Sequence, residues 1–80
     1  MLRVMPLDVR IRVGRSIRTF RRERGWTQEE LAGLAGIMRA NLSNIELGKV
    51  EAGIATLESI AKALSLKNGI VKLEDLVKGG

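Results

Sequence analysis

The sequence predicts an all-α protein, a compact bundle of five short helices. Apolar residues recur every three or four positions in five separate segments, and this spacing places them on one face of a helix. Glycines stand between the segments, where helices commonly end. With 80 residues, 45% of them hydrophobic, the chain can build one core of modest size. The predicted helices cover residues 8–24, 28–35, 39–47, 54–64 and 71–78.

The first predicted helix follows a short lead-in, residues 1–7, which holds the only proline and is a candidate arm. Residues 9–13 alternate between apolar and basic side chains, as in a strand, but helical spacing prevails from Val13 onward. Asp8 is expected to cap the start of this helix, and Gly25 is expected to mark its end.

The middle of the chain carries the clearest local signals. Thr27 and Glu30 have the spacing of a capping box, in which each side chain accepts a hydrogen bond from the other residue's backbone N–H. This helix is expected to stop at Gly36, where the chain must turn. Met38 then takes the N-cap position of the next helix and offers no capping side chain. Two short helices joined in this way form a helix-turn-helix, and we interpret residues 39–47 as its recognition helix.

The other apolar residues are assigned to the core. Ala32 is small, so the two helices of the motif can pack closely there, and Trp26 is expected to fill the core. The fourth predicted helix begins after Gly53 and has its apolar positions at Ile54, Leu57, Ile60, Ala61 and Leu64. The segment 66–80 has two interpretations. It closes the core of one chain, or it forms a two-fold dimer interface, with apolar residues Leu66, Ile70, Val71, Leu73, Leu76 and Val77. No linker or repeat divides residues 1–80, so we predict a single domain.

The composition argues against several classes of function. The absence of Cys and His excludes disulfides, thiol nucleophiles, imidazole acid–base chemistry and zinc fingers. One Trp and one Phe are too few for a platform on which single-stranded bases stack. No apolar run approaches the roughly 18 residues that a membrane span needs. We therefore expect a cytoplasmic protein without a metal or another cofactor.

The net charge of +5 is unevenly distributed. Residues 1–25 hold eight arginines against two acidic residues and carry +6, whereas residues 26–48 carry −2 and residues 49–80 carry +1. Positive charge gathered on one segment suits a polyanion such as DNA. A solvated basic helix face explains the same pattern about equally well.

The exposed side of the predicted recognition helix carries residue types that read base pairs. The major groove of B-DNA admits one helix, and a second helix braced across it fixes its angle. Arginine can pair with guanine and asparagine with adenine, while the methyl group of alanine can meet that of thymine. The candidate base-contacting residues are Arg39, Ala40, Asn41, Ser43 and Asn44. Taken singly, each of them is better explained as part of an ordinary polar helix face.

Four further residues are candidates for phosphate contacts or for structural roles. Gln28 stands at the start of a helix, where free N–H groups and the helix dipole favour an anion, and Lys49 follows the recognition helix. Arg21 and Glu46 are candidates for a partly buried ion pair that holds the first and third helices in register. The other arginines of the first helix are expected to attract DNA over a longer range.

Three segments carry a resemblance to a known family: IRTFRRERGWTQEELAGLAGI, NLSNIELGK and TLESIAKAL. Over about residues 13–64 the chain resembles the phage Cro/repressor type, or XRE-like, helix-turn-helix transcription regulators. The resemblance implies a compact helical bundle that binds double-stranded operator DNA, usually as a homodimer. It also implies DNA contacts at the base- and phosphate-contacting residues named above, and a structural pair formed by Arg21 and Glu46.

The short length is similar to that of restriction–modification controller proteins and small phage regulators. This likeness implies a bacterial or phage-type protein that is associated with the nucleoid through DNA. Three positions depart from the family pattern. Met38 replaces the usual Ser or Thr cap, Leu47 stands where a polar residue often touches phosphate, and Ala52-Gly53 replaces a common Pro-Ser.

Two other classes of function are alternatives to sequence-specific DNA binding. A protein-interaction module of the same fold, antitoxin-like or coactivator-like, would act through a partner protein and would show a low salt dependence with DNA. An enzyme has the least support, because the carboxylates fall at capping and surface positions and form no inward-facing pair. We therefore expect no catalysis.

Overall fold

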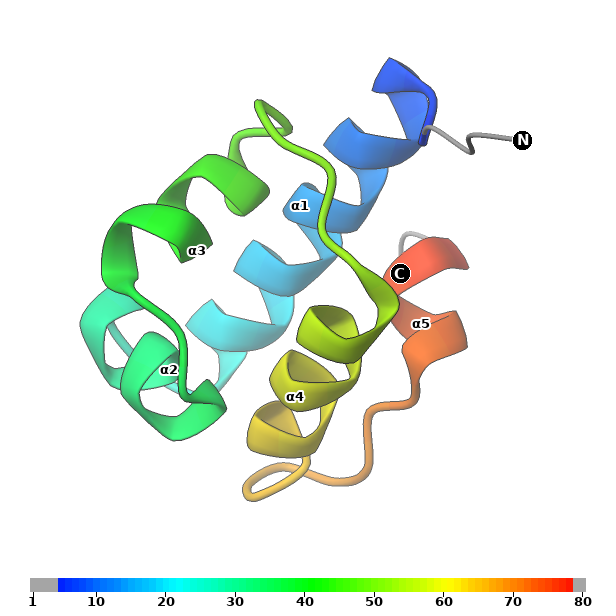
Figure 1. Cartoon of the computed structure of the whole chain (residues 1–80). Helices are drawn as coiled ribbons and strands as arrows, with labels where there is room; N and C mark the ends of the chain where they lie inside the picture. The colour runs from blue at the N-terminus through cyan, green and yellow to red at the C-terminus, as the bar shows by residue number, and fades with distance from the viewer. Residues whose placement is uncertain (1–4, 79–80) are drawn as a thin grey trace.

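The computed structural model describes residues 5–78, which form five α-helices and no strand. They are α1 (Leu7–Glu23), α2 (Gln28–Ala35), α3 (Arg39–Glu46), α4 (Ile54–Leu64) and α5 (Leu73–Lys78) (Figure 1). The all-α prediction is confirmed. The bounds of α2 and α4 are those predicted, α3 ends one residue earlier and α5 begins two residues later. None of the helices within residues 5–78 has both the length and the hydrophobicity needed to cross a bilayer.

The start of α1 differs from the prediction, because Pro6 and not Asp8 occupies the N-cap position. Proline suits this position, since its missing N–H would have no partner at a helix start. Its carbonyl accepts a hydrogen bond of 2.9 Å from the N–H of Arg10. Asp8 instead lies in the first turn, where a negative charge complements the helix dipole. At the other end, Gly25 follows the helix with a φ of +72°, as its predicted role as a stop requires.

The predicted arm is only partly described, since residues 1–4 lie outside the described range. The described part packs against the molecule. The backbone N–H of Met5 donates a hydrogen bond of 2.7 Å to Oε1 of Glu51 in the α3–α4 connection. Leu7, the last residue of the predicted arm, already belongs to α1.

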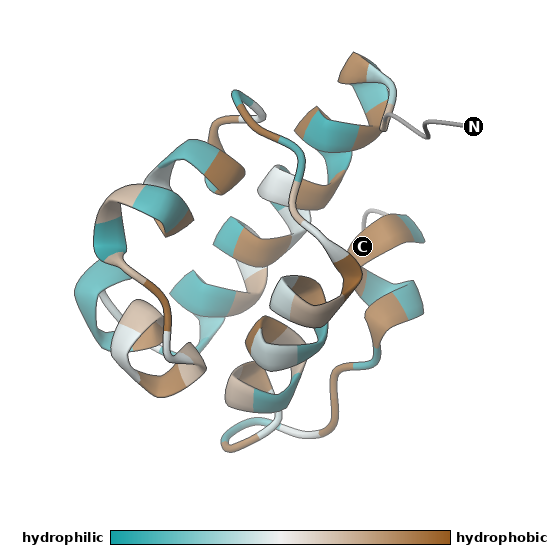
Figure 2. Cartoon of the chain, viewed as in Figure 1, coloured by the Kyte–Doolittle hydropathy of each residue, from teal (hydrophilic) through white to brown (hydrophobic). Residues whose placement is uncertain are grey.

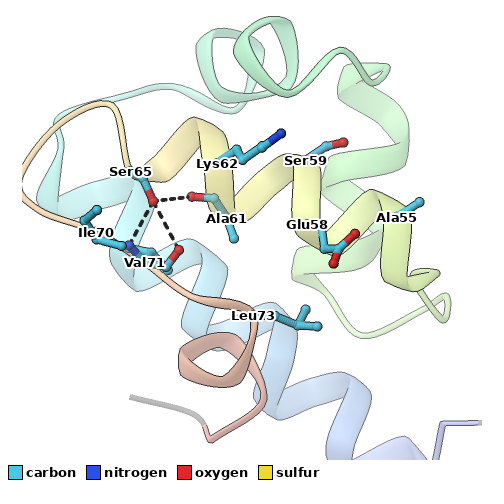
Figure 3. Close-up of a pocket in the computed structure, with 9 residues that line it drawn as sticks. All are labelled: Ala55, Glu58, Ser59, Ala61, Lys62, Ser65, Ile70, Val71 and Leu73. Carbon is cyan, nitrogen blue, oxygen red and sulfur yellow. Dashed lines mark hydrogen bonds between the residues drawn. The ribbon is translucent and has the colours of Figure 1, made fainter.

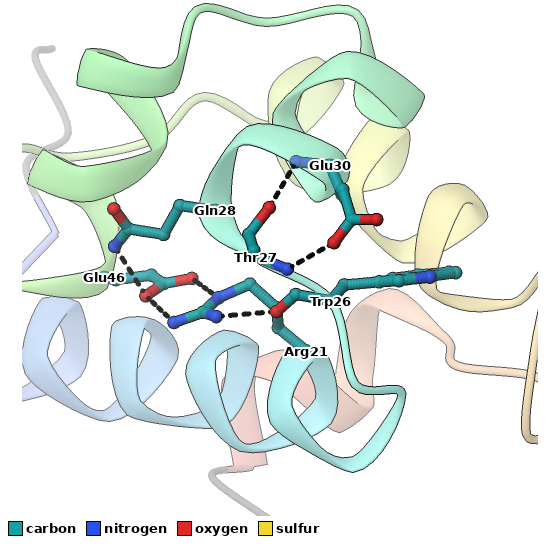
Figure 4. A network of polar contacts seen from close by, with 6 residues as sticks. All are labelled: Arg21, Trp26, Thr27, Gln28, Glu30 and Glu46. Atoms are coloured by element: carbon teal, nitrogen blue, oxygen red, sulfur yellow. Dashed lines mark hydrogen bonds and ion pairs between the residues drawn. The ribbon is translucent and has the colours of Figure 1, made fainter.

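The helix-turn-helix forms as predicted. Thr27 and Glu30 make both hydrogen bonds of the capping box, of 3.1 and 2.8 Å, at the start of α2 (Figure 4). Gly36 ends α2 in the left-handed region with a φ of +72°, where a side chain would be strained. Met38 precedes α3 and makes no capping hydrogen bond with its side chain, so the start of α3 is closed less well than that of α2.

The core lies where all five helices meet. α1 packs against α3 and α5, and α4 packs against α2 and α5. Figure 2 shows hydrophobic and hydrophilic residues alternating along the helix ribbons, as expected for helices with one buried side. The largest fully buried side chains are Ile17, Leu31, Leu42, Ile60, Leu64, Leu76 and Val13. Trp26 is only half-buried and packs against the edge of this core, so it covers the core instead of filling it.

The C-terminal segment has features of both predicted roles, closure of the monomer core and a dimer interface. Val71 and Leu76 are buried in the core of the single chain. Leu66, Ile70 and Val77 remain exposed, at 68%, 78% and 39%. The segment therefore closes the monomer core with some residues and leaves others free to contact a second molecule. Residues 79–80 lie outside the described range.

Candidate nucleic-acid interface

The five predicted base-contacting residues lie on the side of α3 that faces away from the core. Arg39, Ala40 and Asn41 are exposed, and Ser43 and Asn44 are partly exposed. The opposite side of α3 buries Leu42, Ile45 and Glu46. The exposed side chains of α3 are therefore available to enter a groove. Arg39 lies at the N-terminal end of the helix, where recognition helices commonly contact bases.

Arg21 and Glu46 form the predicted ion pair, and it is buried. Nε of Arg21 lies 2.7 Å from Oε2 of Glu46, and Nη2 of Arg21 lies 3.0 Å from Oε1. The remaining guanidinium nitrogen, Nη1, donates a hydrogen bond of 2.8 Å to the carbonyl of Trp26 (Figure 4). One guanidinium thus joins the end of α1, the chain just before α2 and the end of α3. Such a two-point contact fixes direction as well as distance.

Gln28 has a contact that the sequence did not predict. Its Nε2 donates a hydrogen bond of 3.0 Å to Oε1 of Glu46, and its side chain is half-buried (Figure 4). A carboxylate can only accept, so this contact determines which end of the amide faces Glu46. Gln28 nevertheless lies beside α3, as a candidate phosphate contact should.

Lys49, the other candidate phosphate contact, lies just past α3 and is exposed. Its backbone N–H donates to the carbonyl of Asn44 at 3.0 Å, which closes the end of the helix. The preceding residue, Gly48, has a φ of +73° and lies against Ile11 of α1, where a Cβ would come within 2.9 Å of that side chain. The exposed residue Lys49 is therefore held by a tightly packed turn.

The basic segment is less available to a polyanion than its charge suggests. Arg21 and Arg24 are both buried. Nε of Arg24 donates to the carbonyl of Leu64 at 2.7 Å, and Nη1 donates to the carbonyl of Phe20 at 2.9 Å. Arg24 thus ties α1 to the end of α4. The remaining arginines of α1 include four with exposed side chains, namely Arg12, Arg15, Arg18 and Arg22.

Gly14 is a structural residue that the sequence pattern does not reveal. A Cβ at this position would clash with the backbone carbonyls of Ile45 and Glu46, the oxygen of Glu46 lying 2.5 Å away. α1 and the end of α3 therefore touch backbone to backbone. A glycine in a helix carries no local mark of such a contact, because the contact is made by residues far away in the chain.

A notch lies between α1, α2 and α3. Its volume is about 140 Å³, and it is lined by Arg18, Arg21, Gln28, Ser43, Glu46 and Leu47. The notch gathers one candidate base contact, one candidate phosphate contact and the buried ion pair. From the sequence, Arg18 is expected to contribute only long-range attraction, because its nearness to α3 depends on how the helices pack.

A larger depression of about 740 Å³ lies elsewhere, between α4 and the chain leading to α5 (Figure 3). The hydroxyl of Ser65 donates to the carbonyl of Ala61 at 2.8 Å and accepts from the N–H of Val71 at 2.9 Å, and these bonds hold the connection in place. None of the lining residues belongs to α2 or α3, so this depression is separate from the notch. Among the described residues, no three acidic side chains gather as metal ligands would.

Comparison with known proteins agrees with this arrangement. A family model described as "Helix-turn-helix" matches residues 17–67, which is more than half of the chain. The chain belongs to the helix-turn-helix family. The family is one of DNA-binding transcription regulators, and the predicted resemblance to its Cro/repressor type is confirmed.

Two curated repressors are among the relatives of this helix-turn-helix protein. It is 40% identical over 53 residues to the competence pilus inhibition repressor of Acinetobacter baylyi, with 66% of this chain and 48% of the relative covered. It is 39% identical over 67 residues to the immunity repressor protein of Bacillus phage phi105, with 82% and 46% covered. The chain thus spans about half the length of these two relatives.

A solved structure matches over nearly its whole length. The restriction–modification controller protein C.AhdI from Aeromonas hydrophila superimposes with a TM-score of 0.76 at 25% identity, with 84% of this chain and 94% of that chain covered. The two chains therefore share one fold.

Proposed function

We propose that this helix-turn-helix protein regulates transcription by binding a specific double-stranded operator sequence, with α3 in the major groove. The observation that carries the proposal is the exposed polar side of α3, whose opposite side is fixed to α1 by the ion pair of Arg21 and Glu46. A recognition helix needs both features, because base contacts discriminate only when the helix is held at one angle. The protein would act in the cytoplasm, bound to bacterial or phage DNA.

The proposal assigns base reading to the exposed residues of α3. Arg39 would pair with guanine, Asn41 or Asn44 with adenine, and Ala40 would contact a thymine methyl group. Ser43 would add a hydroxyl, which can bond to either kind of base. Gln28 and Lys49 would bind phosphates on either side of the groove and so set the register of α3.

We further propose that two copies bind one operator. A single domain of this kind reads only a few base pairs, and a two-fold dimer would place two recognition helices about 34 Å apart, one turn of DNA. The exposed apolar residues Leu66, Ile70 and Val77 lie close together in the chain and are suited to the dimer contact.

Selection of bound duplexes from random DNA, followed by sequencing, tests this proposal. We expect one enriched motif with two half-sites related by two-fold symmetry, and an affinity that falls steeply as salt rises. If no motif is enriched and binding changes little with salt, the DNA-binding proposal is wrong. The protein-interaction module, the second interpretation of the sequence, would then have the better claim.

A further inference from the structure

We propose that the notch between α1, α2 and α3 is a phosphate-binding subsite, in which Arg18 supplies the positive charge and Gln28 a neutral donor. This inference rests on the proposed function and names a contact residue on α1 that the sequence had not singled out. Three lining groups support the inference. The guanidinium of Arg18 is free, the carboxylate of Glu46 is neutralised by Arg21, and the amide of Gln28 is oriented by Glu46.

The carboxylate in the notch does not repel an anion. Glu46 accepts three hydrogen bonds, from Nε and Nη2 of Arg21 and from Nε2 of Gln28, at 2.7, 3.0 and 3.0 Å. Its side chain is only 2% exposed. The negative charge is therefore paired and covered, and Arg21 is fully used in pairing it.

Arg18 is the free cation of the notch. Its side chain is exposed, and it forms no ion pair or side-chain hydrogen bond with any residue from 5 to 78. Since Arg21 and Glu46 cancel, the net charge of the lining is +1 and comes from Arg18. A guanidinium can donate two parallel hydrogen bonds to the two free oxygens of a phosphodiester.

Gln28 is held ready to donate. The contact with Glu46 engages one N–H of its amide and leaves the second N–H available. Ser43 of α3, whose side chain carries a hydroxyl, also lines the notch. A phosphate placed between them would meet a cation on α1, an amide on α2 and a hydroxyl on α3, all within a volume of about 140 Å³.

Leu47 explains why the charge has to come from α1. It stands at the end of the recognition helix with 57% of its surface exposed, and its side chain cannot donate a hydrogen bond. It does form an apolar wall of the notch, and such a wall strengthens the interaction between a charge and its partner by reducing contact with water. The notch lies beside Ser43 and Leu47, toward the opposite end of α3 from Arg39. A phosphate held there would fix α3 along the groove.

Phosphate neutralisation on the selected duplex tests this subsite. Each phosphate of one half-site is replaced in turn by an uncharged methylphosphonate, and binding is measured for the wild type, Arg18→Ala and Arg15→Ala. Arg15 is the matched control, because it is an exposed arginine of α1 that does not line the notch. Circular dichroism checks that each variant is folded.

We expect one phosphate whose neutralisation weakens wild-type binding about tenfold, the size of one charge-assisted hydrogen-bonded contact. The same neutralisation should have little effect on Arg18→Ala and its full effect on Arg15→Ala. Arg18→Ala should also reduce the slope of log affinity against log salt by about one for each protomer.

Two results would overturn the inference in distinguishable ways. If a duplex is selected but Arg18→Ala and Arg15→Ala give the same affinity and the same methylphosphonate profile, the subsite is wrong and the proposed function stands. If the wild type selects no duplex at all, the proposed function fails and the subsite fails with it.

Discussion

The guanidinium of Arg21 binds the carboxylate of Glu46 through two hydrogen bonds of 2.7 and 3.0 Å, and this pair joins the last turn of α1 to the last turn of α3. The same guanidinium donates to the carbonyl of Trp26 just before α2. One guanidinium therefore connects α1, the start of α2 and α3, and the angle of α3 relative to α1 depends on it. This pair is the structural basis of the proposed recognition surface.

Removal of one partner of this pair should be costly. Glu46→Ala leaves Arg21 buried without its counter-ion, so we expect the free energy of unfolding to fall by about 3 kcal/mol. Urea denaturation followed by circular dichroism measures the change. The double variant Arg21→Met with Glu46→Leu removes both charges and should lose much less than the two single variants combined. A loss below about 1 kcal/mol for Glu46→Ala would mean that the pair contributes no more than a surface pair does.

Two glycines in helices should respond in opposite ways to the same substitution. Gly14→Ala forces a methyl group onto the backbone of α3 and should destabilise the protein by about 1–3 kcal/mol. Gly33→Ala, in exposed open space on α2, should stabilise it by about 0.5–1 kcal/mol. Thermal unfolding of both variants compares them directly. Equal effects would show that helix propensity alone governs both positions, contrary to the close approach of α1 and α3.

A capping side chain at the N-terminus of α3 should stabilise the protein. Met38 is 74% exposed and makes no capping bond, so Met38→Thr should add a cap and raise the free energy of unfolding by about 1 kcal/mol. Thr27→Ala, which removes the capping bond of α2, should lower it by a similar amount. Met38→Ala is the control for loss of the methionine side chain. If it stabilises the protein as much as Met38→Thr, the gain does not come from capping.

The dimer can be tested by placing a charge on its proposed interface. Ile70 is 78% exposed, so Ile70→Glu should leave the fold intact and shift the protein from dimer to monomer. Sedimentation at tens of micromolar measures the shift. Leu34→Glu, an exposed apolar residue on α2, is the control and should stay dimeric. A wild-type protein that sediments as a monomer at that concentration would count against the dimer.

Features fixed by neighbouring residues could be predicted from the sequence. The capping box of Thr27 and Glu30 and the turn at Gly36 depend on a few adjacent positions, and both are present as predicted. The prediction at Asp8 is wrong, because Pro6, two positions earlier, occupies the N-cap position and Asp8 lies in the first turn. Local patterns rank candidates for a helix start, and the packing of the preceding residues decides among them.

The long-range features could not be predicted, for a common physical reason. Arg18, Arg21 and Arg24 stand in one basic run, yet the first is exposed and the other two are buried. Their roles depend on which groups of α3 and α4 lie opposite them. Gly14 is similar, because the carbonyls that exclude a side chain there belong to residues more than thirty positions away. The pairing of Arg21 with Glu46 is the exception, because the sequence alone makes the two residues candidates for an ion pair and the structure confirms it.

The most direct test of the central claim compares the duplexes selected from random DNA by the wild type, Arg39→Ala and Arg15→Ala. The wild type should enrich one motif. Arg39→Ala should enrich the same motif with one position relaxed, at a cost of about 1–3 kcal/mol for the preferred base, because a two-point contact to guanine is lost. Arg15→Ala should keep the motif and bind all sequences more weakly. A wild-type motif that Arg39→Ala leaves unchanged would contradict the assignment of α3 as the helix that reads the operator.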